Sequence, residues 1–164
     1  MFGFRSQHRW VFAAFAVSIL FLCYVVDRTD FGQVALGYSL AFYGYYFWME
    51  KGHFRNLKEI LTYAVIMRLL LIASTPLLSD DYFRFIWDGL IQCQGINPFN
   101  TIPNELQGIS PYMEQLRSSM NSPDYYSVYP PVMQWLFHGI SLIVGESTIG
   151  QIISMRLLLI LSDI

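Results

Sequence analysis

The residue types best suited to chemistry lie close together between residues 79 and 89. Asp80, Asp81 and Asp88 supply three carboxylates and Arg84 supplies a guanidinium, all within nine residues. This stretch directly follows an apolar run that ends at Leu78. Because charged side chains are seldom needed for packing alone, we expect reactive charge here, at the rim of a membrane.

The composition and the apolar runs predict a membrane protein. Of the 164 residues, 54% are hydrophobic and 13% are charged, whereas about a quarter of the residues in soluble domains are charged. The expected fold class is all-α, a polytopic membrane helical bundle that forms one membrane domain over residues 1–164. An exterior loop, residues 79–131, is expected to carry amphipathic helices. About five transmembrane helices are expected, at residues 10–26, 31–49, 60–78, 132–144 and 149–164.

The basic residues of the short connections predict the orientation of the chain. Lys and Arg in such connections stay on the cytoplasmic side of a membrane. They gather in the N-terminal flank and in the connection 50–59, namely at Arg5, Arg9, Lys51, Arg55 and Lys58. We therefore expect an integral membrane protein with a cytoplasmic N-terminus and with the loop 79–131 on the exterior.

Charge and cysteine usage argue against several classes of partner. The net charge of −2 does not suggest nucleic acid, because phosphate binding needs clustered Lys and Arg. Cys23 and Cys93 lack metal-ligand spacing, and no His, Cys or acidic cluster is visible, so neither a metal nor another cofactor is expected.

The exterior loop is expected to contain two short helices. The first runs from residue 80 to about 94 with Ser79 as its N-cap, and the second runs over 111–120 with Ser110 as its N-cap. Helical spacing predicts a polar stripe on the first helix that faces a water-accessible cleft, made of Asp81, Arg84, Asp88 and Gln92.

A series of short motifs resembles one enzyme family. In chain order they are Pro76-Leu77-Leu78-Ser79-Asp80-Asp81-Tyr82, Trp87-Asp88-Gly89, Gly95-Ile96-Asn97-Pro98-Phe99 and Val128-Tyr129-Pro130-Pro131. Over roughly Arg68 to Asp163, this series resembles the polyprenyl-phosphate-dependent mannosyltransferases of the GT-C glycosyltransferase superfamily. The resemblance implies a multi-span enzyme of the bacterial cytoplasmic (inner) membrane, with a lipid-phosphate sugar donor.

The resemblance also implies roles for particular residues. Asp80 or Asp81 would be the general base that takes the proton from an acceptor hydroxyl. Arg84 and Asp88 would be supporting residues. Arg68 or Arg156 would hold the donor phosphate, because a guanidinium suits its geometry. The substrate-binding residues would be the following: Trp87, Tyr125, Tyr126 and Tyr129, whose rings could stack on a sugar, and Asn97, which would shape a turn.

Each of these roles has a structural alternative. Asp80 and Asp81 could compensate the helix dipole beside an N-cap. Arg84 and Asp88 could form a surface ion pair, and the tryptophan and the tyrosines could anchor the chain at a membrane interface. The two arginines within apolar runs could serve in internal ion pairs, such as Arg156 with Asp163.

Three functional hypotheses follow. The first is a membrane glycosyltransferase, or the N-terminal portion of one, that transfers mannose or a similar hexose from a polyprenyl-phosphate donor to an exterior acceptor that the sequence leaves unidentified. The alternatives are a non-catalytic integral membrane subunit in contact with the lipid bilayer, and a transporter or flippase fragment. Because such enzymes carry more than five spans, we expect a truncated chain and no activity from the isolated 164 residues.

Overall fold

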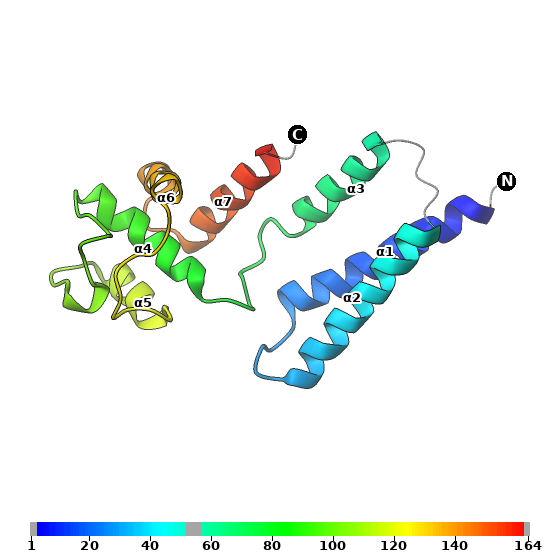
Figure 1. Cartoon of the computed structure of the whole chain (residues 1–164), viewed down its shortest axis with the longest axis horizontal. Coiled ribbons are helices and arrows are strands. Elements are labelled where there is room, and N and C mark those ends of the chain that lie inside the picture. The colour runs from blue at the N-terminus through cyan, green and yellow to red at the C-terminus, as the bar shows by residue number, and fades with distance from the viewer. Residues whose placement is uncertain (1–2, 52–56, 163–164) are drawn as a thin grey trace. The chain divides into compact units, whose positions relative to one another are not determined.

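The computed structural model describes residues 3–51 and 57–162, and within them it is entirely helical (Figure 1). Seven α-helices and one short 3-10 helix are found there, and no strand, in agreement with the expected all-α class. The chain divides into two compact units, Met1–Leu78 and Ser79–Ile164. Each unit is described separately below.

The first unit is built on a pair of helices that run side by side. Helix α1 spans Gly3–Tyr24, α2 spans Phe31–Lys51 and α3 spans Leu57–Leu70. The helices α1 and α2 pack against each other, with Leu22, Val26 and Ala41 buried between them (Figure 1). The hydroxyl of Tyr24 donates a hydrogen bond to the carbonyl oxygen of Leu70, which ties the end of α1 to the end of α3.

The expected transmembrane bundle is not found. In the part of the chain that the structure describes, no helix combines the length and the apolar composition needed to cross a membrane. Helices α3, α6 and α7 have 14, 14 and 15 residues, whereas a span needs roughly 17 to 25. Helix α2 has 21 residues but is rich in glycine and tyrosine. The prediction of five transmembrane helices was therefore wrong for residues 10–26, 31–49, 60–78, 132–144 and 149–164.

The orientation predicted from basic residues stays a prediction. The side chains of Arg5, Arg9, Lys51 and Arg55 lie outside the described part. The helical positions themselves agree with the apolar runs, apart from α3, which ends at Leu70 because the chain turns there ahead of Pro76.

The second unit is arranged around helix α4, which spans Asp81–Cys93. It is followed by the 3-10 helix η1 at Pro103–Glu105, α5 at Pro111–Ser119, α6 at Pro131–Val144 and α7 at Thr148–Ser162. Helix α4 packs against α5, α6 and α7 (Figure 1). The apolar core of the unit lies on α4 and α5 and at the end of α5, and consists of Ile86, Trp87, Leu90, Ile91, Met113, Leu116 and Met120.

Local sequence explains where these helices begin and end. Helix α4 is closed two residues past its last residue by Gly95, which has the left-handed φ of 77°. The Gly95 and Ile96 N–H groups donate to the carbonyls of Gln92 and Ile91. Helix α5 begins as predicted, because the Ser110 hydroxyl accepts a hydrogen bond from the Met113 N–H. The N-cap of α4 is Asp80 and not Ser79, so that prediction was wrong by one residue.

Helices α4 and α6 approach so closely that only glycine fits at position 89. A Cβ atom added to Gly89 would lie 2.3 Å from the Ser141 Oγ and 2.5 Å from the carbonyl oxygen of Phe137. The second of these is a backbone atom of α6, so the helix itself would have to move.

We expect the substitution Gly89→Ala to destabilise the protein by about 1 to 3 kcal/mol, as overpacking of a well-packed core does. The matched control is Gly139→Ala on α6, where no atom lies within 4 Å of the added Cβ. That variant should be neutral or stabilised by up to about 1 kcal/mol, because alanine favours helix. Denaturant unfolding measures both values, and equal stability of the two variants would contradict the close packing.

Candidate functional site

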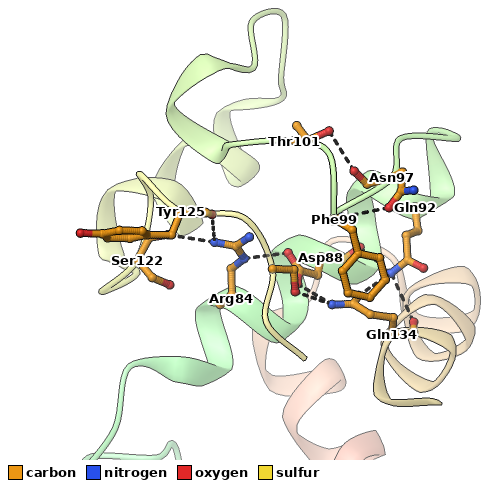
Figure 2. Close-up of polar contacts among 10 residues, drawn as sticks. Arg84, Asp88, Gln92, Asn97, Phe99, Thr101, Ser122, Tyr125 and Gln134 are labelled. Atoms are coloured by element: carbon orange, nitrogen blue, oxygen red, sulfur yellow. Dashed lines mark hydrogen bonds and ion pairs between the residues drawn. The ribbon is translucent and has the colours of Figure 1, made fainter. Parts of the chain in front are cut away.

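The polar stripe of α4 is the centre of the second unit, and two of its four residues, Arg84 and Asp88, are buried. Arg84 is 2% exposed and Asp88 is 0% exposed, and the Arg84 Nε donates to the Asp88 Oδ1 over 2.7 Å (Figure 2). The pair was expected on the surface, beside a water-accessible cleft. The expectation of a surface pair was wrong because α6 and the segment before it cover this face of α4.

The Asp88 carboxylate accepts hydrogen bonds at both of its oxygens. The Ser127 hydroxyl donates to the Asp88 Oδ2 over 2.6 Å and the Gln134 Nε2 donates to the same oxygen over 2.7 Å (Figure 2 shows the second bond). With the Arg84 bond, both carboxylate oxygens are engaged. A buried carboxylate that accepts three hydrogen bonds in this way is suited to holding structure.

Arg84 joins α4 to the segment 121–127. Its Nη1 donates to the carbonyl oxygens of Ser122 and Tyr125, over 2.8 and 2.9 Å (Figure 2). Its Nη2 is buried and has no hydrogen-bond partner among the described residues. The guanidinium therefore uses its planar fork to bind one carboxylate and two backbone carbonyls at once.

Gln92 extends this set of contacts toward α6. Its Nε2 donates to the Gln134 Oε1 over 2.8 Å and to the carbonyl oxygen of Asp88 over 2.9 Å (Figure 2). We call the five connected residues the Arg84–Asp88 network: Arg84, Asp88, Gln92, Ser127 and Gln134. The network joins α4, the segment 121–127 and α6.

The two adjacent aspartates occupy different positions at the start of α4. Asp80 is the N-cap residue and is half-buried, but its side chain makes no capping hydrogen bond. Asp81 is the first helical residue and is also half-buried. The Asp81 Oδ1 accepts a hydrogen bond from the Asn121 Nδ2 over 3.0 Å. Both carboxylates lie where the helix dipole favours negative charge.

The tyrosines after α5 are placed in two ways. Tyr125 and Tyr126 are exposed, at 68% and 53%. Tyr129 is half-buried, because its ring packs edge-on against Phe85 and Phe137 at centroid distances of 4.8 and 6.0 Å. Burial raises the pKa of the Tyr129 phenol, and the nearby charges of Asp81 and Asp88 raise it further. The phenol is therefore a neutral hydrogen-bond donor at physiological pH.

Trp87 and Asn97 have structural contacts. Trp87 is fully buried in the core of α4 and α5, so its ring offers no exposed face. The Asn97 Oδ1 accepts a hydrogen bond from the Phe99 N–H, and its carbonyl oxygen accepts one from the Thr101 hydroxyl, both over 2.9 Å (Figure 2). Asn97 shapes the turn after α4 in this way.

The two arginines expected to hold a phosphate lie in different units. Arg68 is an exposed residue of α3 in the first unit, and its Nη1 donates to the carbonyl oxygen of Ala64 over 3.5 Å. Arg156 is a half-buried residue of α7 in the second unit. Its expected partner Asp163 lies outside the described residues.

Three polar residues of the site were not predicted from the sequence. Ser127, Gln134 and Asn121 bond to Asp88 or Asp81 across 39, 46 and 40 residues. A signal existed for Gln134 alone among them, because it is a strongly polar side chain early in the apolar run 132–144. The other two lie in polar loop sequence, where nothing marks them.

The second unit carries two half-buried carboxylates, a neutral phenol and two exposed tyrosine rings. Such a set could accept a proton from a hydroxyl group and stack against a sugar ring. Among the residues that the structure describes, no three His, Cys, Asp or Glu side chains gather as a metal site requires.

Comparison with known proteins gives one match. A family model described as "Alpha-(1->6)-mannopyranosyltransferase, N-terminal domain" matches residues 8–164. No curated protein and no solved structure matches the chain. The matched range includes every residue of the Arg84–Asp88 network and both aspartates at the start of α4.

We expect Asp88→Asn to lower the free energy of unfolding by about 3 to 5 kcal/mol, because it leaves the buried Arg84 guanidinium without a counter-charge. The control is Glu114→Gln, which removes the exposed ion pair between Glu114 and Arg117, where the Glu114 side chain is 53% exposed. An exposed pair contributes under about 1 kcal/mol. Urea denaturation measures both, and a loss at Asp88 no larger than the loss at Glu114 would contradict a supporting role for the buried pair.

Proposed function

The chain belongs to the alpha-(1->6)-mannopyranosyltransferase family, and on that premise we propose that it transfers mannose from a polyprenyl-phosphate donor to a hydroxyl acceptor. Family membership makes it a mannosyltransferase domain. The lipid-phosphate donor and the α-(1→6) linkage are part of the proposal. Of the three functions considered from the sequence, the family match favours this one over an accessory subunit or a transporter.

The catalytic part of the proposal rests on the hydrogen bonding of the Asp81 carboxylate. One carboxylate oxygen, Oδ1, is held by Asn121, while Oδ2 accepts no hydrogen bond from any described residue. The residue is half-buried at the first turn of α4. A general base needs this combination, because it must be held in direction and still have a lone pair free for the proton.

In the proposed reaction the sugar moves directly to the acceptor. A carboxylate at the start of α4 takes the proton of the acceptor hydroxyl while the hydroxyl oxygen forms a bond to the anomeric carbon. The bond between that carbon and the donor phosphate oxygen breaks, and the phosphate leaves with its electron pair. Asp88 takes no part in the proton transfer, because its oxygens are engaged by Arg84, Ser127 and Gln134.

Two further groups are proposed as substrate contacts. Tyr125 and Tyr126 present exposed rings on the segment that Arg84 holds, and aromatic faces stack well on the apolar faces of sugars. Arg156, in the same unit as Asp81, is the proposed contact for the donor phosphate, which a guanidinium binds through two parallel hydrogen bonds. Arg68 belongs to the first unit, and its assignment to the donor phosphate stays a prediction.

The substitutions Asp81→Asn and Asp80→Asn test the base. We expect Asp81→Asn to lower kcat for transfer of labelled mannose by about 100- to 10,000-fold, the contribution of a general base, and Asp80→Asn to have a smaller effect. The assay uses the protein in its full natural form with polyprenyl-phosphate mannose as the donor. Asp124→Asn is the control, since Asp124 is an exposed carboxylate of the same unit.

Wild-type rates in both the Asp80 and the Asp81 variants would remove the catalytic assignment. No mannosyl transfer by the wild-type protein from this donor would remove the proposed donor.

A further inference from the structure

We infer that Asn121 is a positioning residue for Asp81, an inference that rests on the proposed function. The Asn121 Nδ2 donates to the Asp81 Oδ1 over 3.0 Å, across 40 residues of sequence. Neither the motifs nor the helical spacing of α4 points to Asn121, because it lies in the loop after α5. The contact brings that loop to the one carboxylate of α4 that is both half-buried and not saturated.

The backbone of Asn121 is held on both sides. The preceding residue, Met120, is the buried C-cap of α5, and its N–H donates to the carbonyl oxygen of Leu116. The carbonyl oxygen of the following residue, Ser122, accepts a hydrogen bond from the Arg84 Nη1 over 2.8 Å. Because both neighbours are held, the backbone keeps the exposed Asn121 within hydrogen-bond reach of Asp81.

The consequence for Asp81 is a fixed carboxylate plane. A short acidic side chain at the first turn of a helix can rotate its carboxylate unless a donor holds one oxygen. The Asn121 amide holds Oδ1, which leaves Oδ2 as the oxygen that receives a proton. Catalysis by a positioned group depends on such alignment, and a small misplacement costs much of the rate.

The charges around this carboxylate are consistent with that role. The negative charge of Asp81 contributes to the raised pKa of the Tyr129 phenol. The phenol is therefore neutral and adds no second negative charge near Asp81. Arg84 is the cation nearby, and its ion pair is made with Asp88. Across the loop the Asp81 carboxylate accepts from the Asn121 amide, and its own N–H donates to the hydroxyl of Ser79.

The variant Asn121→Ala, assayed in the full natural protein, tests this role. We expect kcat to fall about tenfold with KM unchanged, which corresponds to about 1.4 kcal/mol of transition-state stabilisation. Asn121→Asp should lower kcat as well, because it replaces the amide donor by a second carboxylate that cannot donate to the Asp81 Oδ1.

The matched control is Asn104→Ala. Asn104 is an exposed asparagine whose Nδ2 donates to the Asp124 Oδ1 over 2.6 Å, so it tethers the same loop without touching Asp81. A purely structural role of the loop would make both alanine variants lose rate alike, with no selective loss of kcat in Asn121→Ala. That result would overturn the inference.

A second measurement is independent of activity. The side-chain amide resonance of Asn121 should move as the pH is lowered through the carboxylate range, and this response should be absent in Asp81→Asn. An unresponsive Asn121 amide in the wild-type protein would overturn the inference.

The two proposals fail in different ways. Full activity of Asp81→Asn overturns the proposed base and with it the positioning role. Loss of activity in Asp81→Asn together with a wild-type kcat in Asn121→Ala overturns only the positioning role.

Discussion

The buried ion pair between Arg84 and Asp88 is the interaction on which the second unit depends. Removing two charges from water costs several kcal/mol for each ion, and hydrogen bonds to the remaining donors and acceptors offset part of this cost. Here Asp88 accepts hydrogen bonds from Ser127 and Gln134 in addition to the one from Arg84. Arg84 also donates to the carbonyl oxygens of Ser122 and Tyr125. The pair therefore selects one arrangement of the loop, because no other position of that loop would supply the same partners.

Helix α4 carries two carboxylates with different hydrogen bonding. Asp88 accepts three hydrogen bonds and holds α4, the segment 121–127 and α6 together. Asp81 lies seven residues earlier, two turns away, and keeps one oxygen without a hydrogen bond from the described residues. The rigid part of the network thus supports the part proposed to do chemistry, and the loop that Arg84 holds also carries Asn121 and the exposed ring of Tyr125.

Local signals predicted the helices of this unit well and its contacts poorly. The helix expected over residues 80–94 is observed at 81–93, and the one expected over 111–120 is observed at 111–119. Periodicity, Ser110 and Gly95 are short-range features that the sequence displays directly. The burial of Arg84 could not be read from spacing, since its partners are 38 and 41 residues away. Three of the expected membrane spans, at α3, α6 and α7, were overestimated because the apolar runs there form helices of only 14 or 15 residues.

The most direct test of this account is amide hydrogen exchange in the variant Arg84→Lys. Lysine keeps a positive charge beside Asp88 but lacks the fork that binds the carbonyls of Ser122 and Tyr125. We expect faster exchange at the Ser127 N–H, which bonds to the carbonyl oxygen of Pro98, and at the Asn104 N–H, which bonds to that of Pro123, while the amides of α6 keep their protection. Unchanged exchange at both loop amides would contradict the claim that Arg84 holds this loop on α4.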